Sequence, residues 1–404
     1  MLNNKTVVLG VTGSIAAYKA AEIASQLTQA GANVNVIMTR EAVQFVSPIT
    51  FRALTGRPVV TEMFDIASEF SIEHVSLAKS ADIVVIAPAT ANIIAKLAAG
   101  ISDDMLCCTV LATKAPVVIA PAMETNMYDS PITQDNLCEL KARGFVIIGP
   151  SVGWLASGKE GLGRLADTDE ILESIRQISG RDGDLAGKHI VVTAGGTQEP
   201  IDPVRCIVNR SSGKMGYALA EAARDRGAEV SLVTAPASSA PATGVDIIRV
   251  GTAEEMCHAV ESVAPKADAL IMAAAVADYR PRSTSREKIK RAGSGLTLDL
   301  ECTRDILGTV KGNLIKVGFA AETGNLVGNA RDKLKQKGLD LIVANDITAS
   351  DSGFGTDTNR VTVIDKEGGV DSLPLLTKQE VAETILDRVA QLLLEPESRL
   401  QNKH

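Results

Sequence analysis

Apolar and polar positions follow a strand–turn–helix–strand order at the start of the chain. Residues 5–11 form an apolar run, residues 12–14 read as a tight turn, and residues 15–31 carry apolar positions at helical spacing. Residues 32–38 form the next apolar run. This order is typical of a βαβ unit in a parallel α/β sheet. We therefore predict that the first half of the chain begins a doubly wound sheet.

The same order recurs in the second half of the chain. Residues 189–194 read as a buried strand, a long polar loop follows, and residues 217–227 have helical spacing before another apolar run. Between the halves, residues 179–187 are rich in Gly and Asp, a composition typical of a domain boundary. The pattern predicts an α/β protein of two Rossmann-like doubly wound domains, at residues 1–180 and 188–404.

Composition changes this picture little but excludes some functions. The 404 residues are 45% hydrophobic and 22% charged, as is usual for globular domains. The net charge of −8 argues against general nucleic-acid binding, which needs a basic surface. The six cysteines form no CxxC pair, and no apolar run approaches the roughly 18 residues of a membrane span. We expect a cytoplasmic protein without nucleic-acid or membrane partners.

A dinucleotide site is the first alternative to test for the opening βαβ unit. Its fingerprint requires GxGxxG after the first strand and an acidic residue at the end of the second. Gly10 and Gly13 have the wrong spacing, and the second strand runs into Thr39 and Arg40. A mononucleotide such as FMN fits better, because one phosphate at the helix start needs only Gly13, Ser14 and backbone donors.

The stretch of residues 193–216 carries the strongest candidate chemistry. It is long, polar and glycine-rich, and Ser211, Ser212 and Lys214 stand where the following helix begins. A helix N-terminus offers unpaired N–H groups to an anion, and Asn209 beside it can hydrogen-bond an amide or a carboxylate. Loops of this length in compact domains tend to be functional. We therefore expect a binding site for an anionic substrate here.

Two segments carry a resemblance to known enzymes. The segment GGTQEPIDPVRCIVNRSSGKMG, residues 195–216, resembles the signature of phosphopantothenate–cysteine ligases. In the first half, APATANIIAKLAAGISDDML, residues 87–106, is similar to the flavin-binding segment of FMN-dependent cysteine decarboxylases. From about residue 5 to about residue 390, the chain resembles the bifunctional phosphopantothenoylcysteine decarboxylase/phosphopantothenate–cysteine ligase family of coenzyme A synthesis.

The resemblance implies an N-terminal, flavodoxin-like decarboxylase domain that binds FMN. His74 matches the family's catalytic histidine, although a lone histidine is usually structural or solvated. Read without the family, Thr90 and Asn92 are loop and helix-cap residues. By the resemblance, the positions near the flavin are Gly13, Ser14, Thr39, Thr90, Asn92, Ser102 and Asp103.

Two positions depart from the family pattern. Glu124 stands where the family has an asparagine for the substrate carboxylate, and a glutamate repels that group unless it is protonated or turned away. Asn126 is the neighbouring candidate to replace it. Ser157 lies in a glycine-rich segment, residues 153–163, which we expect to close over substrate. The family often has a proton-donating cysteine there, and a serine hydroxyl is a far weaker acid than a thiol of pKa about 8.5.

The resemblance implies a C-terminal ligase domain that uses CTP with Mg²⁺. The carboxylate of 4′-phosphopantothenate becomes an acyl-cytidylate, and the amine of cysteine then displaces CMP. Asn209 is the candidate that holds the acyl-cytidylate, and Lys288 is the candidate for activation. Lys288 lies in a basic run, residues 280–291, which would otherwise read as a solvated face. The further substrate positions are Ser211, Ser212, Met272, Ala273, Ala274, Asp278, Arg304, Asp305, Ile306, Leu307, Phe319, Lys333 and Lys337.

Two alternative functions stay open at this point. One is a working ligase joined to a domain that binds flavin without decarboxylating, which Glu124 and Ser157 motivate. The other is a nucleotide-sugar or NAD oxidoreductase, against which the missing ribose-binding acid argues. The resemblance also implies a homo-oligomer, with dimers of the ligase domain and trimers of the flavin domain. The residues do not identify metal ligands or decide between CTP and ATP.

Overall fold

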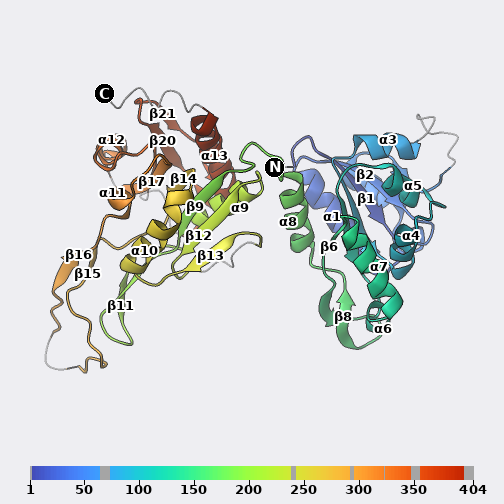
Figure 1. Cartoon of the computed structure of the whole chain (residues 1–404), viewed down its shortest axis with the longest axis horizontal. Coiled ribbons are helices and arrows are strands. Elements are labelled where there is room, and N and C mark those ends of the chain that lie inside the picture. Colours follow the sequence, from blue (N-terminus) through green and yellow to red (C-terminus); the bar gives the residue numbers. More distant parts are fainter. Residues whose placement is uncertain are drawn as a thin grey trace. The chain divides into compact units, whose positions relative to one another are not determined.

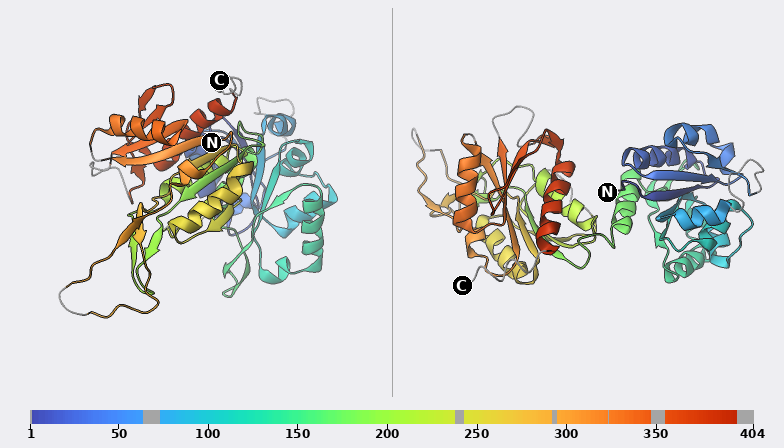
Figure 2. Two further views of the ribbon diagram at one scale, coloured as in Figure 1. Left: turned by 60° about the vertical axis from the view of Figure 1, so that its left-hand side comes forward. Right: turned by 90° about the horizontal axis from the view of Figure 1, so that it is seen from above.

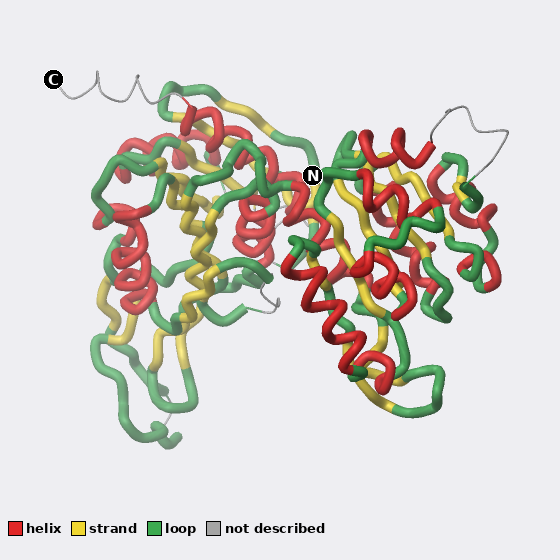
Figure 3. The backbone as a smooth tube through the Cα atoms, turned by 45° about the vertical axis from the view of Figure 1, so that its right-hand side comes forward, coloured by secondary structure: helices red, strands yellow, loops and turns green. Residues whose placement is uncertain are grey.

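The chain folds into two compact units, residues 1–180 and 181–404. The structure is a computed structural model that describes residues 2–63, 73–237, 243–291, 295–322, 324–346 and 355–394. Helices flank both faces of the main sheet in each unit (Figure 3). Among the described residues, no helix combines the length and the apolar character needed to cross a membrane.

The N-terminal unit is built on a six-stranded sheet in the order β3-β2-β1-β4-β5-β6, with all neighbouring strands parallel. Its strands are β1 (Thr6–Val11), β2 (Asn33–Met38), β3 (Val59–Val60), β4 (Ile83–Ala89), β5 (Val117–Pro121) and β6 (Val146–Ile147). This order confirms the doubly wound α/β prediction. The strand order reverses between β1 and β4, and ligands of such sheets bind at the carboxyl edge beside that reversal.

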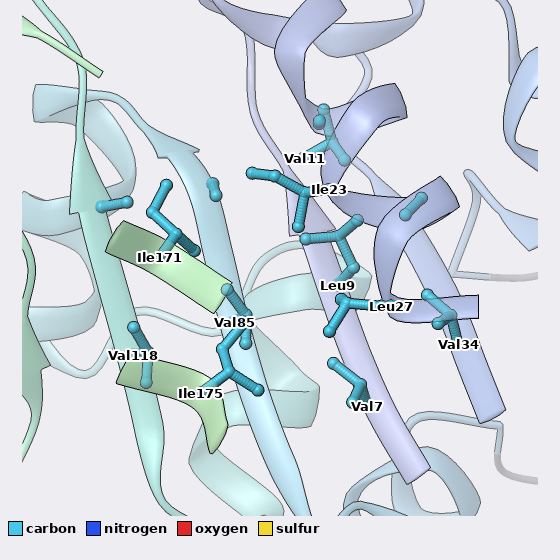
Figure 4. Packing of buried hydrophobic residues seen from close by; sticks show 14 of the residues in the cluster. Val7, Leu9, Val11, Ile23, Leu27, Val34, Val85, Val118, Ile171 and Ile175 are labelled. Atoms are coloured by element: carbon cyan, nitrogen blue, oxygen red, sulfur yellow. The ribbon is translucent and has the colours of Figure 1, made fainter. Parts of the chain in front are cut away.

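Helices complete this unit and bury a core of branched aliphatic residues. They are α1 (Ala17–Gln29), α2 (Pro48–Thr55), α3 (Glu73–Ser80), α4 (Ala91–Ala99), α5 (Met105–Ala112), α6 (Thr125–Tyr128), α7 (Pro131–Ala142) and α8 (Thr168–Ser179), with a short 3₁₀ turn η1 (Ala42–Gln44). In Figure 4, Ile23 of α1 and Ile171 of α8 pack in one cluster with Leu9, Val85 and Val118 of the sheet. Burial of these side chains fixes both helices on the sheet.

The glycine-rich segment expected to close over substrate is an antiparallel hairpin. It consists of β7 (Ser151–Trp154) and β8 (Glu160–Arg164). Ser157 lies in the turn between the two strands. The hairpin therefore carries the predicted proton donor at its tip.

The C-terminal unit is built on an eight-stranded sheet in the order β13-β12-β9-β14-β17-β18-β20-β21. Its strands are β9 (His189–Ala194), β12 (Glu229–Thr234), β13 (Asp246–Arg249), β14 (Ala269–Met272), β17 (Ile315–Glu322), β18 (Leu341–Asp346), β20 (Val361–Asp365) and β21 (Val370–Ser372). The first six are parallel and repeat the arrangement of the N-terminal sheet, whereas β20 and β21 are antiparallel. The strand order here reverses between β9 and β14.

Five helices and three small two-stranded antiparallel sheets complete the described part of the C-terminal unit. The helices are α9 (Lys214–Arg224), α10 (Ala253–Val263), α11 (Ile306–Thr309), α12 (Leu326–Lys337) and α13 (Lys378–Leu394), and a 3₁₀ turn η2 (Ala264–Lys266) follows α10. Two of these sheets are the hairpins of β10 (Gln198–Pro200) with β11 (Cys206–Val208) and of β15 (Tyr279–Pro281) with β16 (Leu300–Cys302). The third pairs β19 (Thr358–Asn359) with β22 (Leu376–Thr377).

The two hairpins form an arm. The β10–β11 and β15–β16 hairpins lie side by side and project away from the main sheet of their own unit (Figures 1 and 2). The loop between β9 and α9 therefore does not lie flat on the sheet edge, as a simple strand–loop–helix pattern suggests. Its first half forms part of the arm, and only its second half returns to the start of α9.

Candidate functional site

In the N-terminal unit, one buried threonine joins the two loops at the strand-order reversal. The Thr12 hydroxyl donates to the carbonyl oxygen of Pro88 at 2.6 Å and accepts from the backbone N–H of Thr90 at 3.1 Å. The Thr90 hydroxyl in turn caps α4 by accepting from the N–H of Ile93. This bonding brings the predicted positions Ser14 and Thr90 to the same edge of the sheet.

Gly13 and Thr39 support the turns of this edge. A Cβ at Gly13 would lie 2.3 Å from the Cβ of Glu41, so no larger residue fits without moving the loop after β2. The Thr39 hydroxyl accepts from the N–H of Ala42 in that loop. Sequence reasoning assigned both positions to the flavin, and the structure gives each of them a structural contact as well.

A cavity of about 330 Å³ opens beside the start of α1, and we call it the Ser14 cavity. Ser14, Glu124 and Ser157 line it, so three of the predicted positions meet there. No side chain caps the N-terminus of α1, whose N-cap residue is Ala16. The backbone N–H groups of Ala16 and Ala17 bond to Ser14, so what this edge offers a phosphate or carboxylate is the positive dipole end of the helix and the O–H of the serine. This donor set fits the phosphate of a mononucleotide.

Glu124 is the N-cap residue of α6. One carboxylate oxygen accepts from the backbone N–H of Asn126 at 2.7 Å, and the other accepts from the Asn126 side-chain amide at 3.3 Å. The glutamate is therefore turned toward the helix start. The side-chain amide of Asn126, the expected replacement for the family's asparagine, is engaged by Glu124.

The predicted catalytic His74 and several predicted flavin positions lie outside the Ser14 cavity. His74 is half-buried in the first turn of α3, Asn92 is exposed in the first turn of α4, and Ser102 is exposed in the loop after it. Asp103 forms an ion pair with Lys96 at 2.8 Å. The Lys96 ammonium lowers the pKa of the Asp103 carboxyl below its ordinary value.

Among the described residues, one cluster of side chains has its ligand atoms close enough together to hold a metal ion. It consists of Asp103, Asp104 and Cys107. The Lys96 ammonium lies 2.8 Å from Asp103 and 3.1 Å from Asp104, so both carboxylates already have a cationic partner. Burial raises the pKa of the Cys107 thiol, which keeps it protonated. The arrangement is that of an ion-pair network, and we assign no metal to it.

The C-terminal unit uses two threonines at its own strand-order reversal. The Thr193 hydroxyl, at the end of β9, accepts from the N–H of Ala274 at 3.1 Å. The Thr197 hydroxyl accepts from the N–H of Ala277 at 2.9 Å. Both threonines are fully buried. Ala274 and Ala275 bond to this loop, and β14 ends before them at Met272.

A cavity of about 470 Å³, the Arg304 cavity, lies on one side of the loop after β14. Lys333 and Lys337 lie one turn apart on α12 and both face this cavity, together with the aromatic ring of Phe319. Lys337 pairs with Asp305 at 3.1 Å. The predicted substrate positions that line the cavity are Met272, Ala274, Asp278, Arg304, Asp305, Ile306, Leu307, Phe319, Lys333 and Lys337.

A second cavity, of about 450 Å³, adjoins the first, and we call it the Asn209 cavity. The Asn209 side-chain amide donates to the carbonyl oxygen of Val276 at 2.9 Å, which ties the end of the 195–213 loop to the loop after β14. The predicted positions Asn209, Ser211, Ser212 and Ala273 line this cavity. Residues that line both cavities, and so form a shared wall, are Ala274, Val276, Asp278, Phe319 and Lys333.

Lys288 lines neither of these cavities. It lies in the segment after β15 that returns along the arm, and it is exposed. The next residue, Ile289, donates its N–H to the buried carboxylate of Asp202 at 3.1 Å and accepts from the Arg205 guanidinium at 2.6 Å. Hydrogen bonds from Arg205 and from backbone N–H groups lower the pKa of the Asp202 carboxyl. The predicted activating lysine is thus fixed to the arm.

Sequence reasoning missed residues that line these cavities. Lys19, Trp154 and Arg164 line the Ser14 cavity. Asn359 and Lys378 line the Asn209 cavity. In the sequence, Lys378 reads as an ordinary first-turn helix lysine and Asn359 as a loop residue. The pattern carries no signal for either, because their place in the site depends on how the last strands and α13 return to the sheet.

Comparison with known proteins covers nearly the whole chain. The flavoprotein family matches residues 1–180, and the DNA/pantothenate metabolism flavoprotein C-terminal domain family matches residues 185–393. The coenzyme A biosynthesis bifunctional protein CoaBC of Bacillus subtilis (strain 168) is 48% identical over 398 residues, covering 97% of this chain and 98% of that protein. The protein of the same name from Mycobacterium tuberculosis (strain ATCC 25618 / H37Rv) is 43% identical over 408 residues, covering 96% and 97%. A crystal structure of the C-terminal domain of a CoaBC protein is 42% identical, with a TM-score of 0.46, and covers 53% of this chain and 99% of that one.

Proposed function

The chain belongs to the family of bifunctional flavoproteins of coenzyme A biosynthesis, and on this premise we propose that it catalyses two successive reactions. The first joins 4′-phosphopantothenate to cysteine, and the second decarboxylates the product to 4′-phosphopantetheine. The relatives are named bifunctional over their full length, which favours two activities over a ligase with an inactive partner domain. Because the chain belongs to this family, we do not propose that it is a nucleotide-sugar or NAD oxidoreductase.

The observation that carries the ligase assignment is the pair of adjoining cavities with a shared wall. CTP occupies the Arg304 cavity, where Arg304, Lys333 and Lys337 supply positive charge for a triphosphate. 4′-Phosphopantothenate occupies the Asn209 cavity with its carboxylate at the shared wall. The two reacting groups then lie side by side, and holding them in this way lowers the entropic cost of the reaction.

The ligase chemistry proceeds in two displacements. A carboxylate oxygen attacks the α-phosphorus of CTP, and pyrophosphate leaves. The amine of cysteine then attacks the carbonyl carbon of the acyl-cytidylate, and CMP leaves with the bonding electron pair. Asn209, whose amide already bridges the two loops, holds the acyl-cytidylate. Asp278, exposed on the shared wall, is the carboxylate best placed to meet the Mg²⁺ that accompanies CTP.

Lys288 is proposed to stabilise charge during activation. Because its segment is tied to Asp202 on the arm, this role requires the arm to bring residues 286–290 toward the shared wall. Sequence resemblance supports the assignment, and Lys288 itself lines neither cavity.

The decarboxylase is assigned to the N-terminal unit with FMN as cofactor. When bound, the flavin supplies the two-electron redox chemistry that makes the carboxylate a good leaving group. Ser14 and the positive dipole end of α1 hold its phosphate, with Thr39, Thr90 and Asn92 at the same sheet edge. Ser157, at the tip of the β7–β8 hairpin, moves the proton to the product. His74 remains the proposed catalytic histidine, and Ser102 and Asp103 remain proposed flavin contacts.

The protein is further proposed to work in the cytoplasm as a homo-oligomer. Its N-terminal unit exposes large apolar side chains, among them Ile49 at 72% and Leu111 at 66% exposure. Exposed apolar side chains of this size are commonly covered by another subunit. Trimers of this unit and dimers of the C-terminal unit are the proposed assembly.

Nucleotide release tests the ligase assignment. The purified protein is supplied with 4′-phosphopantothenate, Mg²⁺ and either CTP or ATP, and the products are followed with and without cysteine. We expect pyrophosphate without cysteine, and CMP only after cysteine is added. Release of CMP without pyrophosphate, or activity with ATP alone, would contradict the assignment.

A further inference from the structure

Glu254, in the first turn of α10, links the arm to the wall of the Arg304 cavity. Its Oε2 atom accepts a hydrogen bond from the Arg280 guanidinium of β15 at 3.1 Å. Its Oε1 atom lies 3.6 Å from the Arg304 guanidinium. Arg304 lines the cavity, whereas Glu254 does not. The carboxylate therefore contacts, from outside the cavity, an arginine that we assign to the triphosphate.

Hydrogen bonds fix the backbone on both sides of Glu254. The buried carboxylate of Glu199, on β10 of the arm, accepts from the N–H of Ala253 at 2.8 Å. The side chains of Thr252 and Glu255 form a capping box, in which each accepts from the backbone N–H of the other residue. The start of α10 is thus held to the arm, and the Glu254 carboxylate is presented from a fixed position.

The segment that carries Arg304 packs against the same helix. Met256 of α10 lies in one buried cluster with Ile306 and Leu307, which follow Arg304 in α11. The backbone of Arg304 is therefore held close to α10, but its side chain is 54% exposed. A long exposed side chain has many rotamers and loses that freedom when it binds a ligand. The ion pair with Glu254 restricts Arg304 before any ligand arrives.

The contact between Glu254 and Arg304 is loose enough to release the arginine to a ligand. At 3.6 Å the two groups form an ion pair without a hydrogen bond. Ion pairs between partly exposed groups are weak, whereas a guanidinium binds a phosphate through strong charge-assisted hydrogen bonds. The N–H groups of Arg304 therefore turn to the triphosphate when the nucleotide binds, and Glu254 orients the side chain until then.

We propose that Glu254 is a positioning residue of the ligase reaction, which orients the Arg304 guanidinium toward the nucleotide phosphates. The inference rests on the proposed ligase function. Glu254 touches no substrate and acts through Arg304. Because it reduces the rotamer freedom that Arg304 loses on binding, it favours binding of the nucleotide and leaves binding of the acyl substrate unchanged.

A double-mutant cycle on the full-length protein tests this role. Steady-state CMP formation gives kcat and the KM values for CTP and 4′-phosphopantothenate in wild type, Glu254→Gln, Arg304→Met and the double variant. Glu254→Asp is the conservative variant. Glu261→Gln is the matched control, because Glu261 is an exposed glutamate of the same helix whose ion pair is with His258, at 3.6 Å. Thermal unfolding of every variant checks that the fold is kept.

We expect Glu254→Gln to raise the KM for CTP about 3- to 10-fold, the coupling usual for groups of one ion-pair network. The kcat and the KM for 4′-phosphopantothenate should stay within about twofold, as should all values for Glu261→Gln. Glu254→Asp keeps the charge and should recover part of the loss. In the Arg304→Met background, Glu254→Gln should change the KM for CTP by less than about twofold, because its partner is already absent.

Three results would overturn the inference. An unchanged or lowered KM for CTP in Glu254→Gln would show that the carboxylate does not assist nucleotide binding. An equal rise in both KM values would indicate a structural role. A full effect of Glu254→Gln in the Arg304→Met background would show that Glu254 does not act through Arg304.

Failure of the proposed function gives a different result. If the wild-type protein forms no CMP, the ligase assignment fails, and calorimetric titration with CTP and Mg²⁺ decides the inference. Glu254→Gln should then bind CTP about 3- to 10-fold more weakly than wild type, and it should have no such effect in the Arg304→Met background. Equal affinity of wild type and Glu254→Gln, or no binding of CTP by wild type, would overturn the inference.

Discussion

Buried threonines hold the two loops together at each strand-order reversal. Thr12 does so in the N-terminal unit, and Thr193 and Thr197 do so in the C-terminal unit. Each hydroxyl forms a hydrogen bond with a backbone N–H or carbonyl group outside the strand ladders. These bonds hold the paired loops in one geometry. The proposed reactions take place on these loops, and their precision depends on such bonds.

Thr193→Val tests this role. Valine keeps the shape but leaves the N–H of Ala274 without its acceptor, and we expect a loss of about 1–3 kcal/mol in the free energy of unfolding. Denaturant unfolding of the full chain measures it. Thr362→Val is the control, because that hydroxyl makes a solvent-accessible bond to Ser372. Equal effects of the two substitutions would contradict the structural role of Thr193.

Ser157→Cys tests the proton-donor assignment. Because a thiol is a stronger acid than a serine hydroxyl, the cysteine variant should decarboxylate faster, and Ser157→Ala should be slower than wild type. Release of CO₂ from 4′-phosphopantothenoylcysteine measures both. CMP formation serves as the internal control and should not change. Identical rates for the cysteine, serine and alanine forms would show that another group supplies the proton.

At the residue scale, sequence motifs predicted the residues that line both C-terminal cavities. They did not predict the residues that elements far away in the sequence contribute to these cavities. The segments around Asn209, Asp278 and Arg304 meet in adjoining cavities, as their resemblance to the ligase signature implies. Lys378 could not be predicted, because its burial arises from the packing of α13 against the sheet. Lys288 was predicted from the same kind of motif, and it lies on the arm outside the cavities.

The arm is the element whose form least follows from the pattern of the sequence. Its hairpins have three residues per strand, and β11 and β16 are largely exposed. Strands this short bury too little apolar surface to produce a clear alternation. Polar bonds fix the arm instead, since the Asp202 carboxylate accepts from the N–H groups of Val204, Arg205 and Ile289.

Asp202 should make the arm sensitive to acid. Its pKa is lowered in the folded protein, chiefly by the Arg205 guanidinium, so its stabilising effect is complete above the ordinary aspartate pKa of about 3.9 and is lost as pH falls below it. We expect the exchange protection of the Ile289 amide to fall below about pH 4. Hydrogen exchange followed by mass spectrometry, corrected for intrinsic rates, measures this.

Asp202→Asn supplies the comparison for that experiment. The variant cannot ionise at this position, so its arm should already be poorly protected at pH 7 and should change little with pH. Amides of β9 serve as the internal reference, since that strand lies in the middle of the sheet. Protection in the variant equal to that of wild type at pH 7 would contradict the role given to Asp202.

On the scale of the whole molecule, two units repeat one plan. Each places six parallel strands in the same order, reverses that order beside its first strand, and builds its site there. Apolar runs predicted most strands, and thus the α/β class. A parallel strand that is buried on both faces consists almost entirely of consecutive apolar residues, so it stands out in the sequence. The antiparallel addition of β20 and β21 could not be predicted, because edge pairing depends on which strand the returning chain meets.

The separate cores predict that the two units fold independently. Residues 1–180 and 181–404, produced as separate chains, should each show a single cooperative thermal transition. The first should bind flavin and the second should form CMP, and a mixture of the two should carry out both reactions. Circular dichroism and the product assay measure this. Aggregation of either chain without the other would contradict independent folding.

The most direct test of the two-reaction account is to follow products by mass spectrometry. The purified protein is supplied with 4′-phosphopantothenate, cysteine, CTP, Mg²⁺ and FMN. We predict transient 4′-phosphopantothenoylcysteine followed by accumulation of 4′-phosphopantetheine. Accumulation that stops at 4′-phosphopantothenoylcysteine would contradict the decarboxylase half, and absence of both products would contradict the account as a whole.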